Sequence, residues 1–204
     1  MESIHRERNG DYVSWCTSQV SRLTLSGVAV IEQYLLHIRS LSKTYRAGVG
    51  GCISTSRALE DVQFDVSRGE IVAIVGAAGA GKTTLLLCAG GLVTPDKGSI
   101  ERRCSAAYFR DVVPANACAD GAAWELALID NVDRVYGDVA GAFALLSAAR
   151  RARDCGAALV LAAREARSVE RIADRVLLLD RGRLPCPVAT RPVISTRVAE
   201  ERIR

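Results

Sequence analysis

The sequence predicts an α/β fold in which a mostly parallel central sheet is flanked by helices, with a small antiparallel β part near the N-terminus. Stretches with strand character alternate with helical stretches, which is typical of parallel strands joined by crossover helices. Residues 70–75 and 157–162 are almost wholly apolar, as expected of strands covered on both faces. Residues 34–39 and 58–66 are closer to alternating and predict the antiparallel part. With 204 residues, 49% hydrophobic and 25% charged, the chain can bury a core.

The other elements follow from local pattern. A Gly- and Ser-rich loop is expected at 46–56 and a turn at 67–69. Apolar periodicity predicts helix 82–90, strands 99–103, 105–109 and 124–129, helix 139–154, helix 165–173 and strand 175–179. Turns are expected at 94–98 and 180–182, and residues 111–121 are expected to be irregular.

Composition and charge argue against several classes of protein. The formal net charge is +4, aromatic residues make up 5%, and basic residues form only short pairs, so a nucleic-acid binder is disfavoured. The longest uncharged stretch, 83–95, is too short to cross a bilayer, and residues 1–10 do not resemble a secretory signal. Seven scattered cysteines form no C-x-x-C pair, so a zinc site is not expected. We therefore expect a cytoplasmic protein.

The strongest functional signal is the segment Gly76–Thr83, which reads GAAGAGKT and fits the phosphate-loop pattern G-x-x-x-x-G-K-[ST]. It follows a predicted buried strand and opens a predicted helix, as the motif requires. Glycines let the backbone turn its N–H groups toward phosphate oxygens, the lysine reaches the outer phosphates, and the threonine hydroxyl coordinates Mg²⁺. A glycine-rich turn that binds nothing is the alternative. The predicted nucleotide-binding residues of this loop are Gly76, Gly79, Ala80, Gly81, Lys82, Thr83 and Thr84.

A carboxylate that holds the magnesium is expected at the end of a neighbouring apolar strand. Asp130 meets this expectation, because it closes the apolar run Leu126–Ile129. We therefore predict that Thr83 and Asp130 hold the metal together. The alternative is an aspartate that only caps a turn.

Further segments occur with this loop in the order of one known family. They read LSKTY at 41–45, ALEDV at 58–62, GEIVAIVG at 69–76, TTLL at 83–86, GLVTPDKGSI at 91–100 and IADRVLLLDRGRL at 172–184. Over residues 34–184 the chain resembles the ATP-binding subunit of ABC transporters. The resemblance implies a P-loop NTPase-like fold that binds ATP and Mg²⁺, with the ring of Tyr45 stacked on adenine.

On this resemblance, residues 34–184 form an ABC-type nucleotide-binding domain. An N-terminal extension of unknown role (1–33) precedes it, and a Pro/Arg-rich tail (185–204) follows. The chain also departs from the family, because the stretch between Lys82 and Asp130 is too short to hold the family's helical subdomain. The signature sequence, with which a partner subunit clamps the nucleotide, is absent as well, since no S-G-G occurs.

The family's catalytic positions also differ. The glutamate expected after the magnesium aspartate is Asn131, the switch histidine falls at Arg164, and the expected glutamine falls near Arg110–Asp111. An amide cannot accept a proton from water as a carboxylate does. Glu165 and Asp133 are carboxylates that could take over, but a solvated surface group is the simpler interpretation of both. The catalytic residues are therefore unknown at this stage.

The leading hypothesis is a reduced, degenerate ABC-type protein that binds Mg-ATP at this Walker A loop with weak or absent hydrolysis. A second hypothesis is a non-catalytic, nucleotide-dependent interaction or regulatory module that partners an intact transporter or another complex. A third is a remnant with no nucleotide function. The expected partners are ATP and either a transporter membrane subunit or a second ATP-binding subunit. Such a partner would bring the protein to the inner face of the membrane.

Overall fold

The computed structural model describes residues 14–16, 34–49, 52–112, 124–135, 139–185 and 187–188. Its strands are β1 (Ser14–Cys16), β2 (Tyr34–Val49), β3 (Cys52–Ser67), β4 (Ile71–Val75), β5 (Lys97–Arg102), β6 (Ala106–Arg110), β7 (Leu126–Asp130), β8 (Ala158–Ala163), β9 (Arg175–Leu178) and β10 (Pro187–Val188). Its helices are α1 (Lys82–Ala89), α2 (Val132–Val135), α3 (Val139–Cys155) and the short 3-10 helix η2 (Ala166–Ser168). Most of the proposed extension 1–33, of the tail 185–204 and of the irregular stretch 111–121 lies outside the described residues.

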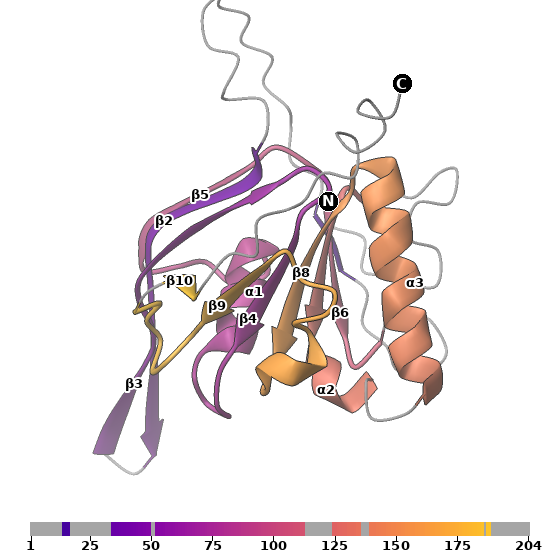
Figure 1. The fold of residues 1–204 in the computed structure, drawn as a ribbon. Coiled ribbons are helices and arrows are strands. Elements are labelled where there is room, and N and C mark those ends of the chain that lie inside the picture. Colours follow the sequence, from indigo (N-terminus) through magenta and orange to yellow (C-terminus); the bar gives the residue numbers. More distant parts are fainter. Residues whose placement is uncertain are drawn as a thin grey trace, which may run out of the picture.

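A seven-stranded sheet forms the centre of the fold (Figure 1), in the strand order β1-β6-β7-β8-β4-β9-β10. Strands β6, β7, β8, β4 and β9 are parallel to their neighbours in this series, whereas the edge strands β1 and β10 pair antiparallel. This confirms the predicted α/β fold. The carboxyl ends of the parallel strands share one edge, and the loop before α1 and helix α2 lie along it at the lower side of Figure 1.

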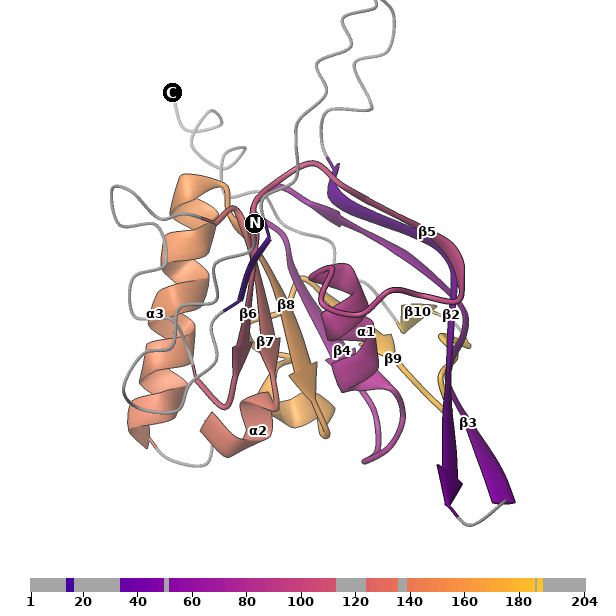
Figure 2. The same cartoon turned by 180° about the vertical axis from the view of Figure 1, so that it is seen from behind.

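A smaller antiparallel sheet, in the order β3-β2-β5, lies beyond α1 (Figure 2). Here β2 and β3 form one long hairpin, and the loop predicted at 46–56 is wrong because Arg46 pairs with Thr55 and Gly48 with Ile53 in its ladder. Residues 54–57 are exposed. Residues 54–57 therefore present no buried apolar face, which is the signal that predicts a strand from sequence.

Helix α1 lies between the two sheets and contacts β7 and β8 on one side and β2 and β3 on the other. Successive residues of the central strands alternate between two hydrophobic cores. In β4, Val72 and Ile74 belong to the core that contains α1, whereas Ile71 and Ala73 belong to the core that contains Leu145 of α3. Because α1 is packed from both sides, the loop at its N-terminus is held against the edge of the central sheet.

The helices are partly as predicted. Helices 82–90 and 139–154 are confirmed as α1 and α3, but the helix predicted at 165–173 is wrong, since only η2 and irregular turns occupy it. Val169 and Ile172 are buried there, and their spacing of three residues suits single turns as well as an α-helix. None of the helices in the described segments has the length and apolar character needed to cross a membrane.

Candidate phosphate-binding site

The loop between β4 and α1 is built on glycines at positions that disfavour a side chain, either by backbone conformation or by lack of space. Gly79 and Gly81 have φ values of 80° and 103°, which L side chains rarely adopt. A Cβ on Gly81 would lie 2.2 Å from the carbonyl oxygen of Ala58, and one on Gly76 would lie 2.2 Å from that of Leu179. Gly76 and Gly81 are therefore required by the close approach of the Leu179 and Ala58 backbone to the loop, and Gly79 by its own backbone conformation, not only by a ligand.

The loop leaves backbone donors at the N-terminus of α1. Within the described part of the chain, no backbone carbonyl accepts a hydrogen bond from the N–H groups of Gly81, Lys82 or Thr83. Unpaired amides at a helix N-terminus form an anion-binding site, to which the helix dipole adds. Ala80 differs, because its side chain is buried and its N–H is used by the carbonyl of Ala77 at 3.2 Å. Thr84 lies half-buried in the first turn of α1.

Lys82 is folded back over the loop. Its Nζ donates hydrogen bonds to the carbonyl oxygens of Gly76 at 2.6 Å and Ala77 at 2.9 Å. Burial lowers the pKa of the ammonium below its ordinary value, and the carboxylates of Asp130 and Asp133 oppose this shift. The lysine is therefore held at the loop by neutral acceptors, which a phosphate group would replace with charged ones.

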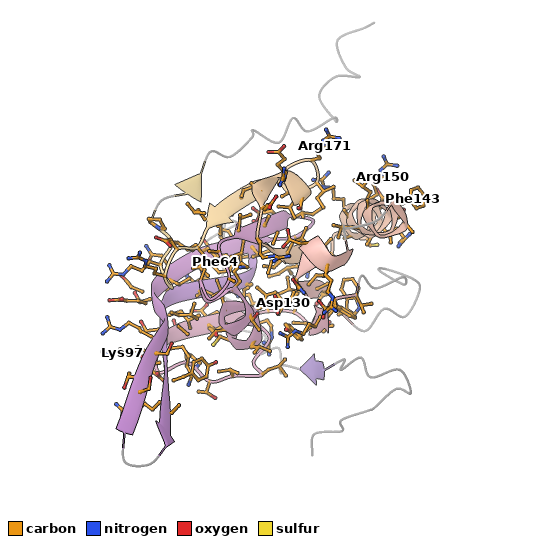
Figure 3. The ribbon with its side chains drawn as sticks, turned by 90° about the horizontal axis from the view of Figure 1, so that it is seen from below. Phe64, Lys97, Asp130, Phe143, Arg150 and Arg171 are labelled. Carbon is orange, nitrogen blue, oxygen red and sulfur yellow. The ribbon has the colours of Figure 1, made fainter. Side chains whose placement is uncertain are left out.

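Asp130 lies inside the fold (Figure 3), with only 3% of its surface exposed. Its Oδ2 accepts hydrogen bonds from the hydroxyl of Thr83 at 2.8 Å and from that of Tyr108 at 2.9 Å. Burial, followed by the charge of Asp130, raises the pKa of Tyr108 well above its ordinary range. The geometry fits a magnesium ion, because a hydroxyl oxygen and a carboxylate, ligands that Mg²⁺ prefers, meet at the phosphate loop.

Tyr108 was not singled out by the motifs, although the sequence held a signal for it. In the ladder between β6 and β7, Tyr108 lies opposite Leu128 and Arg110 opposite Asp130. Residues two apart on a strand share a face, so a tyrosine two positions before the partner of Asp130 lies on the same face as the carboxylate. This inference needs the pairing register, which the motifs do not provide.

Asp111 and Asn131 lie together just beyond these two strands. Both have left-handed backbone conformations, with φ values of 58° and 60°. Asn131 Nδ2 donates a hydrogen bond to Asp111 Oδ1 at 2.5 Å, and Arg134 Nη1 lies 3.7 Å from Asp111 Oδ2. Asn131, which stands where the glutamate is expected, is therefore paired with a carboxylate from the neighbouring strand end.

The remaining carboxylates of this edge are engaged by local donors. Asp133 is only 11% exposed and accepts hydrogen bonds from the backbone N–H of Arg164 at 2.5 Å and from the hydroxyl of Ser168 at 3.2 Å. Its interpretation as a solvated surface group is thus wrong, since it ties α2 to the segment after β8. Glu165 is exposed, as expected, and pairs with Arg167.

Tyr45 lies on the hairpin, away from the central sheet. The residue is 41% exposed, and Lys43 Nζ lies 5.7 Å from the ring centroid. That ammonium is itself fixed by the carbonyl oxygen of Thr94 at 2.8 Å and the carboxylate of Asp96 at 3.0 Å. The ring is available for stacking, and its strand pairs with β3, whose Ala58 touches the phosphate loop.

Comparison with known proteins identifies relatives of the segment that contains this loop. Residues 59–118 match the model of the ABC transporter family. The SkfA peptide export ATP-binding protein SkfE of Bacillus subtilis is 47% identical over 66 residues, which are 32% of this chain and 24% of that protein. The phosphonates import ATP-binding protein PhnC of Treponema denticola is 42% identical over 66 residues, which are 32% of this chain and 23% of that protein. The chain therefore spans about a quarter of the length of these relatives.

Solved structures extend the similarity to the fold. The ATP-binding cassette MJ0796, in a dimeric post-hydrolysis state bound to ADP and Pi, superposes with a TM-score of 0.59 at 14% identity, over 76% of this chain and 99% of that chain. The cbiO1 protein from Clostridium perfringens, part of the ABC transporter complex cbiONQ, gives 0.58 at 15% identity, over 76% and 88%. At these identities the likeness concerns the fold alone.

Proposed function

From the premise that the chain contains an ABC transporter nucleotide-binding domain, we propose that it binds Mg-ATP and hydrolyses it weakly. The proposal extends the domain over residues 34–184. The observation that carries it is the contact between Thr83 and Asp130 directly beneath a loop with unpaired amide donors. A glycine-rich turn with no ligand would have no need of a buried carboxylate at this point.

Each part of the site has a distinct task in this proposal. The amides of Gly81, Lys82 and Thr83 and the ammonium of Lys82 bind the phosphates. Thr83 and Asp130 hold the magnesium ion, which when bound neutralises charge on the phosphates. Tyr45 offers its exposed ring to the adenine base.

Weak hydrolysis is proposed because two groups that would act on the attacking water or the terminal phosphate are replaced. Asn131 carries an amide, which cannot take up a proton, and Arg164 stands where a histidine is expected. A general base at the position of Asn131 would contribute roughly 10²- to 10⁴-fold in rate, and only a base at another position could restore part of it. The remaining donors and the metal would still accelerate the reaction to some extent.

The same replacements support a second candidate, in which the domain binds ATP without turnover and serves as an interaction or regulatory module. A membrane subunit or a second ATP-binding subunit would then be its partner, at the inner face of the membrane. The family match and the two relatives support a partner of this kind, since those relatives are ATP-binding proteins of export and import.

The test is calorimetric titration of the protein with ATP and Mg²⁺. Lys82→Ala should weaken binding at least ~30-fold, since losing a charge partner costs about 2 kcal/mol or more. EDTA should also weaken it. The matched control is Lys97→Ala. Lys97 is exposed on β5 (Figure 3), so this variant should bind ATP as the wild type does.

The outcomes separate the candidates. Binding with turnover that disappears in Lys82→Ala supports a weak ATPase. Binding without turnover supports the interaction module. Absence of binding by the folded wild-type protein would refute both and leave the loop as a remnant.

A further inference from the structure

The pairing of β6 with β7 brings two residues to the edge of the phosphate site. Arg110 lies opposite Asp130 in the parallel ladder, so the next residues, Asp111 and Asn131, leave the sheet together. The backbone N–H of Asp111 donates to the carbonyl oxygen of Asp130 at 3.2 Å. Asp111 is therefore fixed beside the residue whose carboxylate touches Thr83.

The backbone of both residues is held in an unusual conformation. The φ values of 58° for Asp111 and 60° for Asn131 lie in the left-handed region, which Asp and Asn tolerate better than other L residues. Non-glycine residues in this region concentrate at functional sites. Here the two conformations direct the side chains toward each other, as the hydrogen bond from Asn131 Nδ2 to Asp111 Oδ1 demonstrates.

This hydrogen bond leaves one carboxylate oxygen of Asp111 accessible. Asp111 Oδ2 forms an ion pair with Arg134 Nη1 at 3.7 Å, which is longer than a hydrogen bond, and the side chain of Arg134 is itself 74% exposed. The side chain of Asp111 is 33% exposed. A water molecule can therefore reach this oxygen.

The other carboxylates near the loop are less suitable. Asp130 accepts two hydroxyl donors on one oxygen and is buried. Asp133 is occupied on both oxygens by a backbone N–H and a hydroxyl. Glu165 is paired with Arg167 on the surface. Asp111 thus combines a position beside Asp130 with a partly exposed carboxylate that has one oxygen in a long ion pair and, within the described part of the chain, no hydrogen bond to that oxygen.

We propose that Asp111 is the proton acceptor for the water that attacks the terminal phosphate, with Asn131 as its positioning residue. The inference rests on the proposed function. The water oxygen forms a bond to the terminal phosphorus, while the bond from that phosphorus to the bridging oxygen breaks and its electron pair leaves with ADP. One proton of the water passes to Asp111 Oδ2 and then to solvent, and the other stays on the released phosphate. The carboxylate that the sequence lacks after Asp130 is supplied by the neighbouring strand.

The variant Asp111→Asn tests the proton acceptor. Asparagine keeps the size, the tolerance of left-handed backbone and the oxygen that accepts from Asn131, so the protein should fold. ATP affinity should stay within about 3-fold of wild type, while turnover should fall by roughly 100-fold or to the level of Lys82→Ala. The matched control Asp154→Asn, at an exposed position on α3, should leave both unchanged.

The variant Asn131→Gly tests the positioning role. Glycine adopts the left-handed conformation freely, so only the side-chain contact is lost. We expect kcat to fall about 10-fold with KM unchanged, because misplaced catalytic groups lose rate. In the protein without nucleotide, the side-chain amide resonance of Asn131 should shift in Asp111→Ala but not in Asp154→Asn. An unshifted resonance would contradict the contact itself.

The outcomes distinguish this inference from the function on which it rests. If the wild type binds ATP and Asp111→Asn hydrolyses it at the wild-type rate, Asp111 is not the proton acceptor, although ATP binding stands. If the wild type binds ATP without turnover above Lys82→Ala, the inference also fails, and the interaction module remains. If the folded wild type binds no ATP, both the function and the inference fail.

Discussion

Replacing Tyr108 by phenylalanine isolates one hydrogen bond of the phosphate site. The tyrosine is 8% exposed and its hydroxyl donates to Asp130, which is 3% exposed, so solvent cannot replace the lost donor readily. Phenylalanine fills the same space apart from the hydroxyl, so no cavity adds to the cost. A hydrogen bond to a charged group contributes about 1.5–3 kcal/mol. Because Thr83 still donates to the same oxygen, we expect the lower part of this range, about 1.5–2 kcal/mol.

Thermal unfolding measures this cost. For a chain of 150–250 residues, 1 kcal/mol shifts the midpoint by about 2–4 °C, so Tyr108→Phe should unfold roughly 3–8 °C below the wild type. The control Tyr34→Phe removes the hydroxyl of an exposed tyrosine and should shift the midpoint by less than about 1 °C. The double variant Thr83→Val/Tyr108→Phe should lose more than the sum of the single variants, because Asp130 then keeps neither donor. Unfolding of Tyr108→Phe at the wild-type temperature would refute the assignment of this contact as stabilising.

Two further predictions concern the loop and the buried thiols. Gly81→Ala should destabilise the protein by about 1–3 kcal/mol more than Gly156→Ala. Both glycines have positive φ, but a Cβ on Gly81 would lie 2.2 Å from Ala58 O, whereas one on Gly156 would have nothing within 4 Å. Equal urea midpoints of the two variants would contradict the clash. Burial raises the pKa of Cys88 to about 11 and of Cys104 to about 12. At pH 8.5, where an ordinary thiol is about half ionised, iodoacetamide should leave both unlabelled until the protein is unfolded, as peptide mass mapping would record.

The parts of the fold that the sequence predicts well are those set by local pattern. The continuous apolar run in β4 and the motif GAAGAGKT lie within one strand–loop–helix unit, so neither depends on distant residues. The local pattern wrongly predicts a loop at 46–56, since the Gly and polar residues of this segment pair across the two strands of the hairpin. The pattern at 165–173 wrongly predicts a helix, since buried residues three apart suit isolated turns equally well.

The candidate site likewise has one part that local sequence predicts and one part that it does not. The loop that is proposed to bind phosphate is continuous in sequence from Gly76 to Thr84 and follows from the motif, whereas the contacts of Asp130 depend on which residue of β6 faces it. A shift of that register by one residue would move Tyr108 to the opposite face of the sheet and separate Asp111 from Asn131. The assignment of a proton acceptor therefore depends on the strand pairing, which no single motif contains. For that reason the amide at Asn131, taken alone, predicts a site without a base, whereas the paired strand ends supply a carboxylate to the same place.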